Sequence, residues 1–415
     1  MSLVWAENVV RHTNRPVLIL TPLAVSHQVC READKFGIQA HRSPDGKPRP
    51  NITVTNYDRL ERFNADDYSG VVADEASILK HWSGATQKLV TRFLSKVPYR
   101  LLCTATPAPN DFIEMGTLAE ALGALTYSDM LATFFRQLKD DEKKKRATAD
   151  DIIHSKRLSW RVIQSMGQWV MKPHAFEPFW RWVASWARAC RKPSDLGPFD
   201  DSSFVLPPLE RRDHTVTPRT PPPGFLFNVP AFGLNQERQE RRRTLAERTE
   251  LVVKLTEKSD SAVCWVHLNP EGDRLEKEIE GAVQVKGSQS MEEKEERILS
   301  FLNGQSRVLI TKAKIAGLGL NLQCCAHVVT FVDHSWEKFY QCVRRCWRFG
   351  QKRSVTLDVI ATEGEVNVKR NMDRKEKQAG VMFDAVIQSM NQALAVQSTR
   401  PTTLPEVPQW LRPIS

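Results

Sequence analysis

Two arginines in the segment QCVRRCWRFGQ, residues 341–351, have types and a spacing that could serve phosphoryl transfer. On a helix, Arg345 and Arg348 would project from one face, one turn after Gln341. A pair of guanidinium groups suits the spread negative charge of a phosphoryl group in transfer, which an arginine finger stabilises. A basic surface helix would show the same pattern, so the interpretation depends on the other motifs of the chain.

An acidic pair, Asp74–Glu75, follows directly after the apolar run GVVA. In an open parallel sheet, ligands bind in the crevice at the carboxyl ends of the strands. Asp74 could hold Mg²⁺ there, and Glu75 could orient or deprotonate an attacking water. Considered alone, such a pair is more often the charged first turn of a helix, which the helix dipole stabilises.

Two further segments also follow apolar runs. Thr104, Ala105 and Thr106 follow RLLC, and the two threonine hydroxyls could bond to the acidic pair and report the state of a bound nucleotide. Gly317 and Gly319 follow RVLIT and would let a ligand approach the backbone closely. Each segment has an ordinary alternative, which is a strand-ending turn for the first and a strand-to-helix turn for the second.

Strands and helices must position these residues, and the chain divides into four segments on that basis. Residues 1–123 and 251–365 alternate short apolar runs with helix-like stretches, which indicates α/β domains with parallel sheets covered by helices. Residues 124–250 carry charge runs, tryptophans and prolines and are predicted to be a helical insertion and linker. Residues 366–415 are predicted to form a C-terminal helix and tail. The predicted strands are VLILTP, ITVTNY, GVVADEAS, RLLCTATP, AVCWVHL, RVLIT, HVVTFVD and SVTLDVIA.

The composition is that of a globular protein with a basic balance. A chain of 415 residues is long enough for two or three domains, and 41% hydrophobic and 26% charged residues are ordinary values. Lys plus Arg exceeds Asp plus Glu by 59 to 49, which favours a polyanionic partner, although a moderate excess is weak support. No apolar run approaches the length of a membrane span.

The eight cysteines include no CxxC pair, and no secretory signal opens the chain, which favours a reduced cytoplasmic setting. The four cysteines of the last third, Cys324, Cys325, Cys342 and Cys346, could in principle meet at a metal ion. Their spacing is not that of a zinc site, so buried free thiols are the preferred interpretation.

Taken in order, DEAS, TATP, AGLGLNL and QCVRRCWRFGQ resemble the motifs of superfamily 2 helicases, in particular the Swi/Snf-like branch. The likeness covers nearly the whole chain and is greatest to phage-encoded members, whose acidic motif is also followed by SILK, here residues 77–80. LTPLAV at 20–25 and TNYDRL at 55–60 match as well. The resemblance implies two RecA-like domains, ATP and Mg²⁺ as cofactors, and DNA, double-stranded in the first instance, as the partner.

The resemblance also implies a role for each matched residue. It implies that Glu75, Gln341, Arg345 and Arg348 contact ATP and take part in catalysis, and that Asp74 binds the metal ion. It also implies that Gly317, Gly319 and Asn321 contact the nucleotide, and that Thr104, Ala105 and Thr106 couple its state to the rest of the domain. Contact with the nucleic acid falls to Thr21, Pro22, Thr55, Asn56, Tyr57 and Lys312. Short hydroxyl and amide side chains are suitable ligands for a phosphate backbone.

The family's phosphate-binding loop, GxxxxGK[ST], does not occur in these 415 residues. DGK at 45–47 lacks the preceding strand and the following helix that such a loop needs. Residues 1–10 resemble the helix that normally follows the loop, so we expect the chain to begin one strand and one loop late. ATP binding should then be weakened, and neighbouring strands should have unpaired edges. An internal start, a truncated gene, an ATPase-inactive descendant or a complementing second chain would each account for this.

Two other segments have competing interpretations. Trp160, Trp169, Trp180, Trp182 and Trp186 are crowded together, and packing of a helical insertion on the first domain is favoured over stacking on bases. The arginine run at 241–243 is predicted to be a solvated helix face, with contact to DNA as the alternative.

The sequence thus predicts a nucleic-acid-dependent ATPase of helicase or translocase type, which couples ATP hydrolysis between its domains to movement along DNA. An ATPase-inactive or truncated DNA-binding remnant of such a motor is the alternative. RNA is a further candidate partner, because no residue pattern here distinguishes a 2′-hydroxyl.

Overall fold

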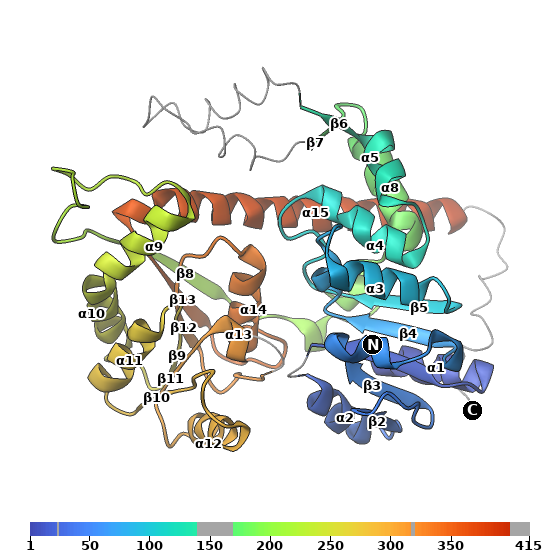
Figure 1. The fold of residues 1–415 in the computed structure, drawn as a ribbon, viewed down its shortest axis with the longest axis horizontal. Coiled ribbons are helices and arrows are strands. Elements are labelled where there is room, and N and C mark those ends of the chain that lie inside the picture. Colours follow the sequence, from blue (N-terminus) through green and yellow to red (C-terminus); the bar gives the residue numbers. More distant parts are fainter. Residues whose placement is uncertain (23–24, 139–168, 317–319, 399–415) are drawn as a thin grey trace. The chain divides into compact units, whose positions relative to one another are not determined.

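The computed structural model describes residues 1–22, 25–138, 169–316 and 320–398, and these form two compact units (Figure 1). Unit 1 contains the described residues up to Cys190 together with those from Ala379 onward. Unit 2 runs from Arg191 to Gln378. Each unit contains a parallel sheet with helices around it. The fold is the predicted one, with two RecA-like domains, a helical insertion and a C-terminal helix.

The sheet of unit 1 has the order β2-β3-β1-β4-β5, and all neighbouring strands are parallel. Four of the strands are those predicted from apolar runs, and β2 is an additional short strand at one edge. At the other edge, all five residues of β5 are half-buried, whereas those of β1 and β3 are fully buried. The strands are β1 Val17–Thr21, β2 Ala40–Arg42, β3 Ile52–Asn56, β4 Gly70–Asp74 and β5 Tyr99–Cys103.

Helices cover both faces of this sheet, because side chains alternate between the faces along each strand. Val17 and Ile19 of β1 pack with helices α1 and α2, whereas Leu18 and Leu20 pack with α3. Strands that are buried on both faces read as continuous apolar runs, which is why the sequence predicted them. The helices are α1 Ser2–Thr13, α2 Ser26–Lys35 and α3 Ala85–Leu94.

The predicted insertion begins with elements that belong to unit 1. These are α5 Tyr127–Phe134, β6 Phe135–Gln137, β7 Trp169–Met171 and α8 Phe176–Trp186, and they follow α4 Met115–Leu122 at the end of the predicted first domain. Trp180 is 1% exposed in the core of the unit and lies edge-on to Phe112, with ring centroids 5.1 Å apart. Trp182 and Trp186 are partly buried against the same core. The packing interpretation of the tryptophans is therefore confirmed, except for Trp160, which lies outside the described residues.

The sheet of unit 2 has the order β10-β11-β9-β12-β13-β8, again with parallel neighbours. The sequence did not predict β8, LERRDHTV, because its charged side chains do not form an apolar run; such a strand is suited to the sheet edge, where it lies. The strands are β8 Leu209–Val216, β9 Ala262–Trp265, β10 Ala282–Gln284, β11 Val308–Thr311, β12 His327–Phe331 and β13 Val355–Thr362. The helices are α9 Gly233–Arg243, α10 Leu245–Thr256, α11 Asn269–Glu278, α12 Met291–Leu302, α13 Ala313–Ala316 and α14 Trp336–Cys346. Helix α15 Val366–Ser398 belongs to unit 2 up to Gln378 and to unit 1 from Ala379.

The arginine run on α9 differs from its prediction. Arg241 donates from Nε to Glu365 at 2.8 Å, and its side chain is 14% exposed. Arg243 donates to Glu240 at 2.6 Å and is 16% exposed. The prediction of a solvated face is wrong for these two residues, because each neutralises a buried carboxylate, and it is right for the exposed Arg242.

No helix among the described residues is both long enough and apolar enough to cross a membrane.

Candidate nucleotide and nucleic-acid site

The segments predicted to carry chemistry in unit 1 all lie at the carboxyl edge of its sheet. Thr21 pairs with Asn56, and Leu20 pairs with Ala73, so β1, β3 and β4 end side by side. Asp74 pairs with Cys103, so Thr104 begins directly beside the acidic pair. Ligands of open parallel sheets bind at this edge, and the register therefore brings the motifs together where a ligand would be expected.

Asp74 is the last residue of β4 and is partly buried. Burial raises the pKa of its carboxyl group. Its main-chain oxygen accepts a hydrogen bond of 2.6 Å from the hydroxyl of Tyr57, the first residue of the 3-10 turn η1 (Tyr57–Arg62). Tyr57 is 3% exposed, and burial together with the nearby carboxylates raises the pKa of its hydroxyl, which stays protonated as the donor. The bond joins the end of β4 to the turn that follows β3.

Glu75 has a left-handed backbone, with φ 53° and ψ 50°, and precedes the 3-10 turn η3 (Ala76–Leu79). Among the described residues, the other non-glycine positions with positive φ are Asn14 and Asn51. Asparagine tolerates this region, but glutamate seldom adopts it, and the strain costs on the order of 1–3 kcal/mol. Such strain is concentrated at functional sites. The conformation turns the chain sharply at the end of β4 and directs it away from the strand.

Thr104, Ala105 and Thr106 follow β5 at the same edge. Thr104 Oγ1 accepts a hydrogen bond of 3.0 Å from the main-chain N–H of Thr106. Thr106 is 1% exposed, and its hydroxyl has no hydrogen-bond partner among the described residues, whereas Ala105 is exposed. The segment is thus a strand-ending turn, which was the alternative interpretation, and it also lies next to the acidic pair.

The residues assigned to the nucleic acid are at this edge but mostly turned inward. Thr21 and Thr55 are 0% and 3% exposed, and their hydroxyls donate to main-chain oxygens, Thr21 to Pro22 at 3.1 Å and Thr55 to Ser43 at 3.2 Å. Asn56 is 2% exposed, and its Oδ1 has no hydrogen-bond partner within the described structure. Pro22 is partly exposed. Contact of these residues with nucleic acid stays a prediction. Because the side chains of Thr21, Thr55 and Asn56 are buried, they are better suited to stabilising the backbone at the carboxyl edge of the sheet.

In unit 2, helix α14 ends at Cys346, and this corrects the predicted helical face. Arg345 lies in the last turn, where its Nε donates to the main-chain oxygen of Gln341 at 3.2 Å. Arg348 lies beyond the helix, in a bend. The helix ends here because the indole of Trp347 donates to Pro207 at 2.7 Å and the amide of Gln351 donates to Cys346 at 3.4 Å. The two arginines are therefore not on one helical face.

The neighbouring Arg344 has a packing role that the sequence did not indicate. Its guanidinium carbon lies 5.2 Å from the ring centroid of Trp347, 5.6 Å from that of Phe349 and 5.9 Å from that of Tyr340. Cations over aromatic faces are attracted by the ring quadrupole. Arg344 thus joins α14 to the bend that carries Arg348, and it fixes the local geometry of the segment.

The remaining candidates of unit 2 follow β11. Lys312 donates from Nζ to Asn269 at 2.6 Å, at the start of α11. Asn321 is exposed and bonds through both side-chain atoms to Gln323. Gly317 and Gly319 lie outside the described residues.

Metal binding by side chains alone has no support within the described structure. No group of three or more His, Cys, Asp or Glu residues there could hold a metal ion, and the cysteines are free. The prediction of buried free thiols is confirmed for Cys325, Cys342 and Cys346 and is wrong for Cys324, which is exposed. A hydrogen bond with Cys346 lowers the pKa of the Cys325 thiol below its ordinary value. Mg²⁺ is usually held by one or two carboxylates together with substrate phosphates and water, so a single Asp74 at the sheet edge fits this ion.

The DGK segment is not a phosphate loop. Gly46 has φ +83° and lies in the connection between β2 and β3, with no helix after it. Asp45 accepts hydrogen bonds from Ser43, from the main chain of Lys47 and from Arg49, which closes a local turn.

Comparison with known proteins identifies part of the chain. Residues 247–350 match the model of the helicase conserved C-terminal domain. Unit 2 carries a helicase C-terminal domain. This domain contains β9–β12 and α14, and therefore Lys312, Gln341, Arg345 and Arg348.

The relatives extend this likeness without covering the whole function. YwqA of Bacillus subtilis (strain 168), named as a candidate ATP-dependent helicase/translocase, is 29% identical over 173 residues. That alignment covers 39% of this chain and only 18% of YwqA, so the chain spans a small part of this relative's length.

Two solved structures are similar over most of their length but with low scores. A Dbp5 variant of S. cerevisiae, bound to a Gle1 variant and IP6, has a TM-score of 0.44 at 11% identity, covering 92% of this chain and 80% of that one. The SWI2/SNF2 ATPase core of Sulfolobus solfataricus in complex with dsDNA has a TM-score of 0.36 at 15% identity, covering 95% and 88%.

Proposed function

We propose that the protein is a nucleic-acid-dependent ATPase of helicase or translocase type that acts on DNA. The observation that carries this proposal is the acidic pair at the carboxyl end of β4, with Glu75 held in a strained left-handed backbone beside Thr104–Thr106. The helicase C-terminal domain of unit 2 supports the same function. The link to phage-encoded members stays a prediction.

The residues of unit 1 suit one half of the reaction. Asp74 would hold Mg²⁺, which neutralises charge on the phosphates of ATP when bound. Glu75 would accept a proton from the attacking water or orient it, and its fixed backbone would limit the positions its carboxylate can take. The turn at Thr104–Thr106 would respond to the state of the acidic pair and pass the change to the rest of the unit.

The residues of unit 2 suit the other half. Arg345 and Arg348 would stabilise the negative charge that develops on the transferred phosphoryl group, and Gln341 would contact the same nucleotide. Because the carboxylates and the arginines belong to different units, turnover would require both, and a change in the bound nucleotide could then be converted into movement along DNA.

ATP hydrolysis by the full chain, with and without duplex DNA, tests this proposal. Glu75→Gln removes the proton acceptor at constant size and should abolish DNA-stimulated turnover while DNA binding persists. Glu61→Gln, at an exposed position of η1 in the same unit, is the matched control and should behave as the wild-type chain. Full turnover by Glu75→Gln would remove this residue from the mechanism.

The alternative function is that of a DNA-binding remnant without ATPase activity. It is favoured by one observation, which is that GxxxxGK[ST] does not occur in the sequence. Equilibrium binding of ATP and Mg²⁺ to the chain separates the two. Saturable binding that Asp74→Asn weakens would support the ATPase, and DNA binding in the absence of any ATP binding would support the remnant. Competition between matched DNA and RNA duplexes would decide the preferred nucleic acid.

A further inference from the structure

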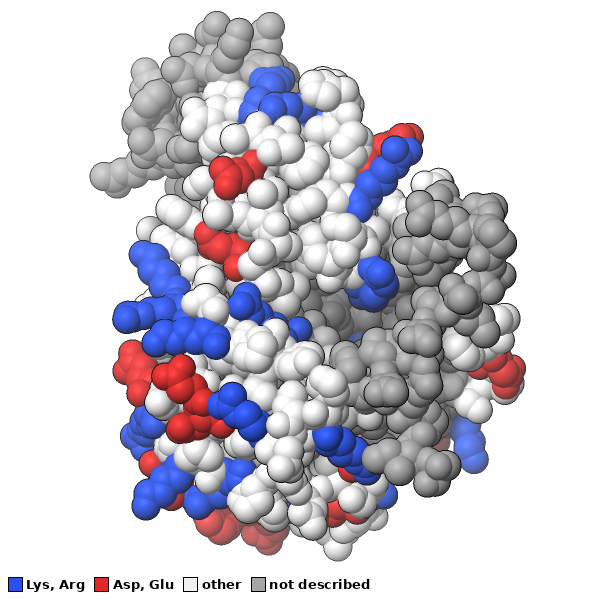
Figure 2. All heavy atoms as spheres, turned by 90° about the vertical axis from the view of Figure 1, so that its right-hand side faces the viewer, with Lys and Arg blue, Asp and Glu red and all other residues white. Residues whose placement is uncertain are grey.

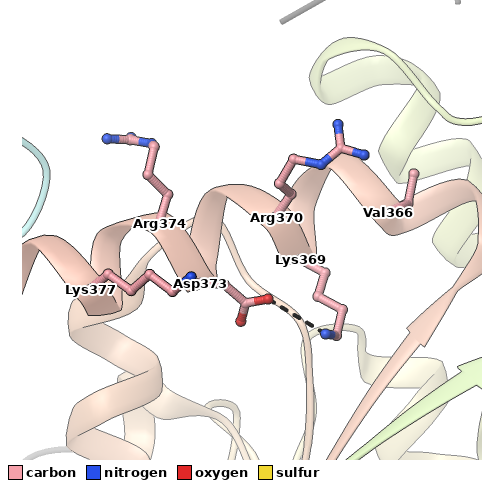
Figure 3. A pocket seen from close by; sticks show the side chains of 6 residues that line it. All are labelled: Val366, Lys369, Arg370, Asp373, Arg374 and Lys377. Carbon is pink, nitrogen blue, oxygen red and sulfur yellow. Dashed lines mark hydrogen bonds and ion pairs between the residues drawn. The ribbon is translucent and has the colours of Figure 1, made fainter. Parts of the chain in front are cut away.

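The exposed face of α15 in unit 2 carries a line of cations. Arg370, Arg374 and Lys377 are exposed and lie four and three residues apart, which places them on one face of the helix. With Val366, Lys369 and Asp373, they line a pocket of about 470 Å³ on the helix surface (Figure 3). In Figure 3, Arg370 and Arg374 project from the same side of the helix, whereas Asp373 turns toward Lys369.

The acidic residues of this helix segment are neutralised from the opposite side. Arg211 of β8 donates to Asp373 and to Glu376, in both cases at 2.7 Å. Lys369 lies 3.5 Å from Asp373 and 3.5 Å from Asp213. The carboxylates are therefore bound to Arg211 and Lys369. They do not neutralise the exposed cations Arg370, Arg374 and Lys377, which we call the outer cations.

The outer cations have no acidic partner of their own. Arg374 donates to the neutral side chains of Asn371 and Gln378, each at 3.0 Å, which holds its guanidinium extended without cancelling its charge. Arg370 and Lys377 have no hydrogen bond or ion pair within the described part of the chain. On the face drawn in Figure 2, basic and acidic side chains are intermingled.

We propose that Arg370, Arg374 and Lys377 form a contact surface for the phosphate backbone of a nucleic acid, which is separate from the sequence motifs. From Arg370 to Lys377 the row advances seven residue positions, or about 10 Å along the helix. One strand of B-DNA rises about 3.4 Å per phosphate, so the row matches about three phosphates. Lys and Arg on a helix suit this backbone without reading its sequence.

This surface deepens the proposed function, on which it rests, by naming where the nucleic acid is held in unit 2. Lys312, the residue that the motifs assign to the nucleic acid in this unit, already donates to Asn269 at 2.6 Å. None of the three cations of α15 is paired with a carboxylate within the described part of the chain, and they supply a contact that the motifs do not provide.

The test is equilibrium binding of the full chain to a labelled DNA duplex, measured by fluorescence anisotropy over a series of salt concentrations. The triple variant Arg370→Gln, Arg374→Gln and Lys377→Gln removes the charge and keeps good helix formers. The matched control is Arg238→Gln, Lys254→Gln and Lys277→Gln, which removes the same charge from exposed positions of α9, α10 and α11 in the same unit.

Each lost phosphate contact lowers the slope of log K against log salt by about 0.9, so the α15 variant should lose about 2.7 of slope. It should bind two duplexes of unrelated sequence with the same loss of affinity, because phosphate contacts carry no sequence information. The control variant should keep the wild-type slope. Equal slopes in the α15 variant and the control would contradict the proposed contact surface on α15. A wild-type chain that binds no nucleic acid would contradict the proposed function as well.

Discussion

The hydroxyl of Tyr57 donates a hydrogen bond of 2.6 Å to the main-chain oxygen of Asp74. It connects the turn after β3 to the end of β4, so a residue assigned to the nucleic acid holds the backbone of a residue assigned to the metal. This places a buried, directional contact between two motifs that are 17 residues apart in the sequence.

Tyr57→Phe should lower the DNA-stimulated rate of ATP hydrolysis and leave the fold intact. The substitution removes one hydrogen bond in a buried site, which costs about 1 kcal/mol of unfolding free energy. Urea unfolding measures the stability, and steady-state kinetics measure whether kcat falls at constant DNA affinity. Tyr68→Phe, which removes a buried hydroxyl that forms no hydrogen bond with the acidic pair, is the control. A rate equal to that of the control would show that the bond is structural.

Glu75→Gly should raise the stability of the protein while removing its activity. Glycine adopts the left-handed region without strain, so relief should add about 1 kcal/mol to the unfolding free energy. Glu61→Gly, within η1, should instead lower the stability by about 0.5–1 kcal/mol. Urea unfolding of both variants gives the comparison. Destabilisation by Glu75→Gly would mean that the glutamate side chain stabilises the edge by more than the backbone strain costs.

Arg345→Ala and Arg348→Ala should each reduce the rate of ATP hydrolysis by about a thousandfold if they stabilise charge in phosphoryl transfer. Lys substitution should recover little activity, because lysine lacks the planar donor pair. Arg242→Ala, at the exposed position of α9, controls for the loss of one positive charge. Single-turnover kinetics with the melting temperature recorded for each variant would separate lost chemistry from lost folding, and unchanged rates would assign both arginines to structure.

Protonation of the Asp358 carboxylate should make the protein less stable in acid. Its carboxylate is 1% exposed and bonds to His327 at 2.6 Å and to His214 at 2.8 Å, which joins β13 to β12 and β8. Burial alone would raise the pKa, but the two imidazoles lower it below its ordinary value of 3.8. A lowered pKa gives stability that is complete above the ordinary value and is lost as the pH falls through the folded value.

Asp358→Asn should therefore cost about 2–4 kcal/mol of unfolding free energy at neutral pH, because the bonds to a charged group are lost in a buried site. The difference between the variant and the wild-type chain should shrink as the pH falls below 3.8. Urea unfolding across this range measures it. A difference that is constant with pH would show that the pKa of Asp358 is the same in the folded and the unfolded protein.

The strands and the site edge were predictable because their signals are local. VLILT and GVVAD are apolar runs buried on both faces, and strand ends in a parallel sheet must share an edge, so the grouping of Thr21, Asn56 and Asp74 followed from their positions. The errors arose where distant residues decide the outcome. Arg241 is buried by Glu365, and α14 stops before Arg348 because Trp347 bonds to Pro207, 140 residues earlier.

Strand β5 has a consequence for how the purified protein behaves. Among the strands that the structure describes, β5 pairs with β4 alone, and its five residues are half-buried. A strand edge with unpaired amides and carbonyls is a template for the edge of another molecule. Concentrated solutions should therefore form oligomers through this edge, and amides on the open side of β5 should exchange with deuterium faster than those of β1.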